Sequence, residues 1–171
     1  IKELADLYHQ AKFGEVIENG KQIARQHQNN LTILNILGAA NAALKQWARA
    51  ASYFRKAVQN SPDDDGYYNL GVMLYNLKEQ EEAMRSFLNA LKFNPEHAEA
   101  NSNLGLVLCD LGRNEEAGKR FRQAIKINPN YAEAHSNLGL VHAAHGQYDK
   151  AIACYNAALE INSDLASTRA E

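Results

Sequence analysis

The chain has 171 residues and a formal net charge of −2, and hydrophobic residues make up 46% of it. The near-neutral charge gives no case for nucleic-acid binding, which needs a concentrated basic surface. No apolar run approaches the ~18 residues of a membrane span, and the mixed charges of the first residues do not form a signal peptide.

Residues 1–30 predict two helices with the least regular pattern in the chain. The Leu4-Ala5 pair stands where later segments carry Leu-Gly. The segment from Phe13 to Ile17 resembles the one from Tyr148 to Ile152, but Gly20 stands where the others have an aromatic residue. We interpret this stretch as a divergent first copy of a repeat.

From residue 31 onwards, one pattern recurs four times in the same phase. Each copy carries a Leu-Gly pair, then an Ala, an aromatic residue and a second Ala. The pairs are Leu37-Gly38, Leu70-Gly71, Leu104-Gly105 and Leu138-Gly139, and the aromatic residues are Phe54, Phe87, Phe121 and Tyr155. Near the end of each copy stands a proline, namely Pro62, Pro95 or Pro129, except in the last copy, which has Ser163 at this place. Such a fixed period indicates a repeat architecture.

Each copy predicts two helices. In the copy at 98–131, apolar residues recur at helical spacing from Leu104 to Leu111, and a second helix is expected from about Asn114 to Ile127, before Pro129. The Gly and Ala positions let the two helices approach closely, and the aromatic residue fills the space beside them. One such pair cannot bury its apolar face alone, so neighbouring pairs must stack.

These positions resemble the signature of the tetratricopeptide repeat family over nearly the whole chain. The resemblance implies an all-α, right-handed superhelical solenoid of antiparallel helix pairs, formed by a single domain of about five repeats. The expected repeats are 1–30, 31–63, 64–97, 98–131 and 132–165, followed by 166–171 as a tail or the start of a further helix.

The same resemblance implies that the first helix of each pair lines a concave groove that binds a peptide. The residues at the groove places that we single out are Asn35, Asp65, Tyr68, Asn69, Asn76, Glu99, Asn103, Asp110, Glu133 and Asn137. Asn69, Asn103 and Asn137 share one place, which Ile36 occupies in the copy before them.

A primary amide both donates and accepts hydrogen bonds, so a column of Asn can pair with a peptide backbone. First helices about 10 Å apart would present one Asn for about every three residues of extended peptide. This column resembles the asparagine ladder in the repeat region of the O-linked N-acetylglucosamine transferases. The last three repeats as a whole resemble that region and related bacterial repeat proteins. The alternative is that each Asn bonds a neighbouring helix.

Asp65, Glu99 and Glu133 form a second column. An acidic rim would favour a neutral or basic peptide. Alternatively, these residues are solvated carboxylates in the first turn of a helix, where the helix dipole favours them.

The residues that could carry chemistry do not form a recognisable site. His135, His142 and His145 lie on one expected helix without a further ligand at metal-binding spacing. Cys109 and Cys154 form no CxxC pair and are interpreted as small apolar residues in a reducing compartment. We therefore expect a cytoplasmic chain with no cofactor and no enzymatic activity.

The leading hypothesis is a scaffold that holds a protein or peptide ligand in the groove. A second is a substrate-recruiting repeat region of a larger glycosyltransferase or sulfotransferase. A third is a structural protein that self-associates through its terminal helices, because little sequence after Leu159 remains to cover the last one.

Overall fold

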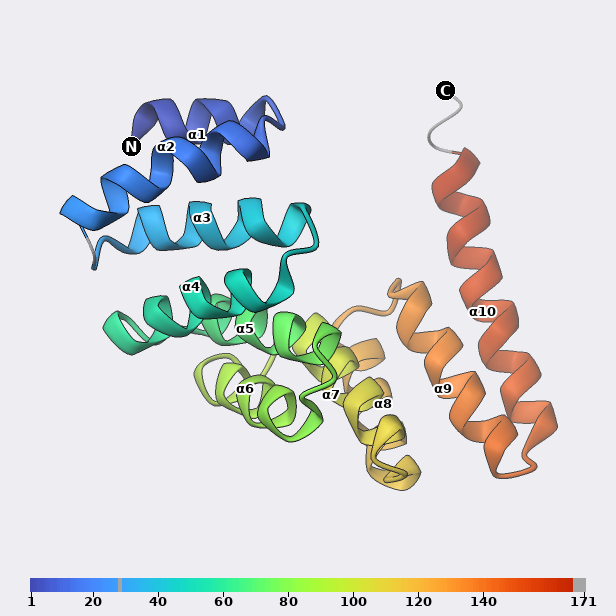
Figure 1. Cartoon of the computed structure of the whole chain (residues 1–171). Helices are drawn as coiled ribbons and strands as arrows, with labels where there is room; N and C mark the ends of the chain where they lie inside the picture. Colours follow the sequence, from blue (N-terminus) through green and yellow to red (C-terminus); the bar gives the residue numbers. More distant parts are fainter. Residues whose placement is uncertain (28, 168–171) are drawn as a thin grey trace. The chain divides into compact units, whose positions relative to one another are not determined.

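The computed structural model of this chain describes residues 1–27 and 29–167, which form ten helices and no strand (Figure 1). The helices are α1 (Lys2–His9), α2 (Phe13–Gln26), α3 (Leu31–Ala43), α4 (Trp47–Asn60), α5 (Asp64–Asn76), α6 (Gln80–Phe93), α7 (Ala98–Asp110), α8 (Asn114–Ile127), α9 (Ala132–Ala144) and α10 (Tyr148–Ser167). The expected all-α fold of antiparallel helix pairs is confirmed.

The chain divides into two compact units, Ile1–Phe93 and Asn94–Glu171. In the first unit, α1 to α6 pack in sequence order, each against the next, and α1 also contacts α3. In the second unit, α7 to α10 do the same, and the two first helices α7 and α9 touch each other. The boundary between the units falls after α6, two residues before Pro95.

The Leu-Gly glycine of each regular pair lies directly against the aromatic ring of its partner helix. A Cβ atom placed on Gly71 would lie 2.7 Å from the Phe87 ring, and one on Gly105 would lie 2.5 Å from Phe121. The pairs Gly38–Phe54 and Gly139–Tyr155 repeat this arrangement at 2.8 and 2.7 Å. Because these distances are too short for any side chain, the glycine is what lets the two helices close around the ring.

The first pair replaces this contact with a different one. Gly20 on α2 is buried, and a Cβ atom there would lie 2.6 Å from Leu37 of α3. Val16, Ile17 and Ala40 form a buried cluster beside it. The residues Leu7, Tyr8, Phe13 and Ile36 pack against that cluster. Leu37 thus lies directly against the place that carries an aromatic residue in the later pairs.

The turn inside each pair requires one residue in the left-handed conformation. These residues are Ala11, Lys45, Lys78, Gly112 and Gly146, with φ between 56° and 73°. In the second pair, Lys45 N–H donates to the Ala42 carbonyl and Gln46 N–H to the Asn41 carbonyl. This is the Schellman arrangement, which satisfies the last carbonyls of a helix.

The second helices α4, α6 and α8 each end two residues before a proline, which has no backbone N–H. α8 ends at Ile127, two residues before Pro129, as its position predicts. In α10 the equivalent place is Ser163, which has a backbone N–H, and the helix continues through it to Ser167. Residues 166 and 167 therefore belong to α10 itself, and residues 168–171 of the expected tail lie outside the described residues.

Candidate functional site

The first unit contains a cleft of about 530 Å³ on the surface formed by its first helices. It is lined by Tyr8, Asn35, Ala39, Ala42, Ala43, Phe54, Asp65, Asn69 and Met73. All but Phe54 come from α1, α3 and α5. The cleft therefore combines small and apolar side chains with two amides and one carboxylate, a composition typical of ligand-binding surfaces.

Three of the expected groove residues meet in this cleft, namely Asn35, Asp65 and Asn69. Asn35 and Asp65 are exposed, and Asn69 is half-buried. The small residues Ala39 and Ala43, one and two turns along α3 from Asn35, keep the space open. These three residues therefore share one surface of the first helices α3 and α5.

Two other expected residues of the first unit do not line the cleft. The Tyr68 ring packs at a tilt against Phe87, with 6.1 Å between the ring centroids. The Asn76 amide donates a 2.8 Å hydrogen bond to the Val72 carbonyl of its own helix. Ile36, which interrupts the Asn column, packs on the buried cluster of the first two pairs instead.

In the second unit, Asn103 and Asn137 are half-buried on the neighbouring helices α7 and α9. Asp110 is exposed at the end of α7. Burial, together with the adjacent Asp110 charge, raises the pKa of the Cys109 thiol. The Asn column thus has one member in the first unit and two in the second.

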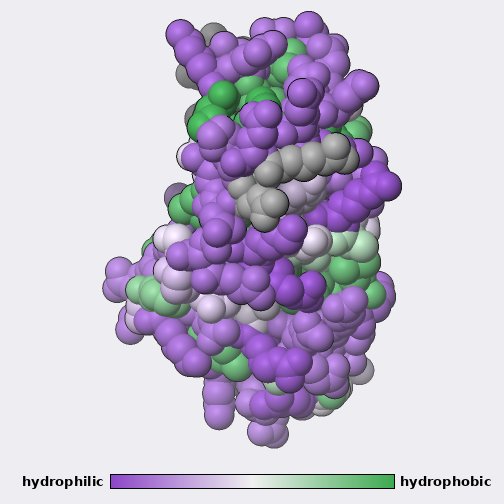
Figure 2. All heavy atoms as spheres, turned by 60° about the vertical axis from the view of Figure 1, so that its left-hand side comes forward, coloured by the Kyte–Doolittle hydropathy of each residue, from purple (hydrophilic) through white to green (hydrophobic). Residues whose placement is uncertain are grey.

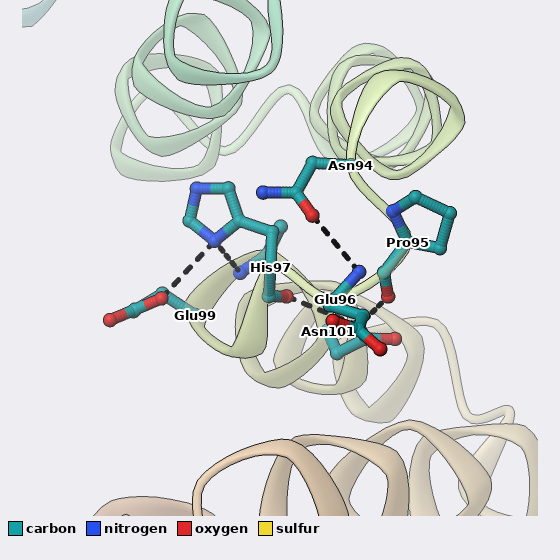
Figure 3. A network of polar contacts seen from close by, with 7 residues as sticks. Asn94, Pro95, Glu96, His97, Glu99 and Asn101 are labelled. Atoms are coloured by element: carbon teal, nitrogen blue, oxygen red, sulfur yellow. Dashed lines mark hydrogen bonds and ion pairs between the residues drawn. The ribbon is translucent and has the colours of Figure 1, made fainter.

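Glu99 lies in a polar network at the start of α7 (Figure 3). Its carboxylate is 3.1 Å from Nδ1 of His97, and the same Nδ1 accepts a 3.3 Å hydrogen bond from the Ala100 N–H. A single Nδ1 cannot accept from Ala100 and donate to Glu99 at the same time, so the two contacts belong to different protonation states. Glu99 therefore has a local partner at the helix N-terminus.

Asn101 supports the same helix start from inside the unit. Its side chain is 1% exposed. The Asn101 amide donates to the carbonyls of His97, at 3.1 Å, and Pro95, at 3.4 Å. His135 occupies the equivalent place on α9, and its Nε2 is 2.9 Å from the Pro129 carbonyl. These side chains fasten a first helix to the proline turn before it.

Glu133 lines a second, smaller cleft of about 360 Å³ in the second unit. Ala132, Ser136, Tyr155, Ala158, Leu159 and Asn162 form the rest of its lining. It lies on the surface between α9 and α10, whose Leu159 is 66% exposed. This cleft therefore borders an apolar part of the last helix.

The described residues contain no group of three or more His, Cys, Asp or Glu side chains arranged to hold a metal ion. Burial raises the pKa of the Cys154 thiol, as it does for Cys109, which keeps both sulfurs in the less nucleophilic thiol form. Within residues 1–27 and 29–167, no helix is long and apolar enough to span a bilayer. Hydrophilic side chains cover most of the face drawn in Figure 2, with hydrophobic ones in small separate patches.

Family models of the tetratricopeptide repeat match residues 21–65, 65–97 and 132–165, and a further TPR repeat model matches 105–146. The chain belongs to the tetratricopeptide repeat family. This confirms the resemblance found in the Leu-Gly, Ala and aromatic positions. No curated protein matches the sequence.

Solved tetratricopeptide structures share this fold at low sequence identity. A crystal structure of MamA is 24% identical, covers 95% of each chain and superposes with a TM-score of 0.88. MamA 41-end from Desulfovibrio magneticus RS-1 is 21% identical over 95% of this chain and 93% of its own, with a TM-score of 0.88. YrrB, described as a TPR protein with an unusual peptide-binding site, is 22% identical over 96% and 85%, with a TM-score of 0.81.

Six residues that line the first-unit cleft are not among the groove residues that we singled out from the sequence, namely Tyr8, Ala39, Ala42, Ala43, Phe54 and Met73. Phe54 is a second-helix residue whose ring reaches the cleft past Gly38. The glycine and aromatic positions of the repeat could have predicted that Phe54 reaches the cleft, because Gly38 has no side chain to cover the ring.

Proposed function

We propose that this tetratricopeptide chain is a protein-interaction scaffold that holds an extended segment of a partner polypeptide on its first-helix surfaces. The observation that carries the proposal is the first-unit cleft in which Asn35, Asp65 and Asn69 surround an apolar floor. An amide offers both a donor and an acceptor to a peptide backbone, and the floor accepts an apolar side chain. The description of YrrB as a peptide-binding TPR protein is in line with this role.

The chemistry of the cleft favours a neutral or basic segment. Asp65 is the one charged side chain among the residues that line it. A carboxylate attracts Lys and Arg side chains and repels acidic ones. Asn103 and Asn137 extend the same amide chemistry to the first helices of the second unit, where we propose them as further backbone contacts.

The test begins with a peptide array that selects binding sequences for the wild-type chain. The combined variant Asn69→Ala, Asn103→Ala and Asn137→Ala should weaken binding of a selected peptide about tenfold or more, since each lost amide removes up to two backbone hydrogen bonds worth about 1 kcal/mol each. The matched control is Asn19→Ala on the exposed face of α2, which should bind as wild type does. Unchanged affinity of the triple variant, with an unchanged circular dichroism spectrum, would rule out the amide contacts.

Self-association through α10 is a second candidate function. Ile152 and Leu159 are 56% and 66% exposed, whereas Ala51 and Val58 at the same repeat places on α4 are 2% and 6% exposed. In the first unit, Val58 lies against Gly66 of the next first helix. Light scattering across concentration should show a mass above that of one chain, which Leu159→Lys lowers and Glu160→Gln leaves unchanged. A constant monomer mass for the wild type would exclude this candidate.

A further inference from the structure

The second unit contains a cleft of about 300 Å³ between α8 and α9, away from the expected groove places. It is lined by Asn114, Glu115, Gly118, Lys119, Arg122, Val141, His142, His145 and Gln147. Nothing in the proposed peptide-holding role uses these residues. They come from α8, from the end of α9 and from the turn between α9 and α10.

The cleft exists because three repeat places carry unusual residues here. Gly118 stands where α4 has Ala51 and α6 has Met84. His142 stands where α5 and α7 carry Leu74 and Leu108, which are 1% and 3% exposed.

His145 is the third unusual residue, because the same place is a leucine in each of the three preceding copies, at Leu44, Leu77 and Leu111. Two places that carry leucine in most of the preceding copies thus carry imidazole rings at this junction, and a third carries no side chain.

Cationic side chains border the space. Arg122 folds over Gly118, with its Nη1 atom 3.5 Å from where a Cβ atom would lie, and Val141 forms a floor at 3.4 Å. Lys119 adds a second permanent positive charge, against the single carboxylate of Glu115. The neighbouring Glu116 is engaged by Arg113 through two 2.8 Å contacts.

The two imidazoles are held in one tautomer by their partners. Nδ1 of His145 lies 2.8 Å from the Val141 carbonyl, and Nδ1 of His142 lies 2.8 Å from Oε1 of Gln147. Because an oxygen of this kind accepts, each Nδ1 carries the proton of the neutral ring, and each Nε2 is then an acceptor. Nε2 donates to an anionic oxygen only in the protonated ring, which also adds a positive charge.

A metal ion is a poor fit, because no third ligand joins the two imidazoles among the described residues. We propose that the cleft formed by Gly118, Lys119, Arg122, His142 and His145 binds an anionic oxygen group such as a phosphate monoester. Arg122 supplies the planar donor pair that matches two phosphate oxygens, and Lys119 supplies a point charge. The group reaches the cleft either as a free phosphate compound or on a phosphorylated side chain of a peptide.

The experiment follows backbone amide shifts of the full chain in NMR spectra during titration. The probes are inorganic phosphate, phenyl phosphate and one phosphoserine peptide. The two organic probes are each compared with the same molecule without its phosphate group. We expect the phosphorylated probes to shift amides of Gly118, Arg122 and His142 selectively. Stronger binding of the phosphoserine peptide than of inorganic phosphate would assign a peptide source, and the reverse order a free one.

Variants separate a specific cleft from general charge attraction. Arg122→Gln should weaken phosphate binding about tenfold or more, in line with loss of a charge-assisted hydrogen bond. Arg85→Gln removes the charge at the repeat place equivalent to Lys119 in the preceding copy and should leave binding unchanged. Gly118→Met restores the residue type of Met84, fills the space and should abolish binding, whereas Gly14→Met, at a glycine with open space around it, should not.

The proposal is overturned if the phosphorylated probes cause no selective shifts, or if Arg122→Gln and Arg85→Gln weaken them equally. Gly118→Met could misfold, so Lys119→Gln at an exposed place provides a second variant, with several-fold weaker binding expected. Peptides selected for the first-unit cleft should bind Arg122→Gln as they bind the wild type. The two proposals can therefore fail separately.

Discussion

The junction between α4 and α5 and the junction between α8 and α9 are built on the same repeat places but filled differently. At the first, Ala51 and Leu74 are 2% and 1% exposed. At the second, the equivalent residues Gly118 and His142 line an open cleft. The glycine–aromatic contacts that set the helix spacing are the same in both units. The repeat pattern thus fixes the backbone, while two or three places decide whether a junction is filled or forms an open cleft.

The largest expected effect distinguishes the two junctions directly. Leu74→Ala should lower the free energy of unfolding by about 2–5 kcal/mol, because it empties a filled, fully buried place. His142→Ala, at the same repeat place, should change it by less than about 0.5 kcal/mol, since that side chain lines open space. Urea unfolding followed by circular dichroism measures both. Equal losses would show that the two junctions are packed alike.

The second prediction concerns the frame that the two junctions share. Gly105→Ala should destabilise the chain by about 1–3 kcal/mol, because the new Cβ atom would lie 2.5 Å from the Phe121 ring. Gly14→Ala meets nothing within 4 Å and should stabilise α2 by about 0.5–1 kcal/mol. If the melting temperatures of both variants changed in the same direction, the close contact with Phe121 would not explain why glycine occupies position 105.

The third prediction concerns Asn41, which occupies in α3 the place of Leu74 and His142. Its Oδ1 atom is buried without a hydrogen-bond partner, while its amide donates to the Leu37 carbonyl at 2.7 Å. Asn41→Leu should raise the free energy of unfolding by about 1 kcal/mol, since it removes an unsatisfied buried polar group. Denaturant unfolding tests this, and a loss of stability would indicate that the amide has a structural role.

The fourth prediction concerns the turns, where the expected effect is no larger than that at Asn41. Gly112→Ala should cost about 1 kcal/mol, because its φ of +73° suits glycine. Lys45→Ala should be neutral within about 0.5 kcal/mol, because Lys45 already bears a Cβ atom at a φ of +56°. Equal melting shifts for the two substitutions would mean that the left-handed turn is relaxed in the folded chain.

The sequence alone predicts the helix pairs well, because each rests on a local rule that repetition reinforces. The end of α8 before Pro129 and the contact between Gly105 and Phe121 are of this kind. The cleft residues Asn35, Asp65 and Asn69 follow from the repeat phase. The contribution of Phe54 does not, because it depends on how a ring from the second helix lies beside Gly38.

The cleft between α8 and α9 also could not be predicted by comparing the repeats with one another. Such a comparison identifies the residues that the copies share, whereas Gly118 and His142 line the cleft because they differ from the residues at the same places in the other copies. Glu99 illustrates a similar limit. Its acidic column is visible in the sequence, but its contact with His97 depends on the rotamer at the start of α7.

The most direct test of the account is to map where a peptide selected by the wild-type chain binds. Amide shifts recorded in NMR spectra during titration should change most at Asn35, Asp65 and Asn69, on the surface of α3 and α5. Shifts confined to the second helices α4 and α6, with Asn35 and Asn69 unmoved, would contradict the central claim that the first-helix surface holds the partner.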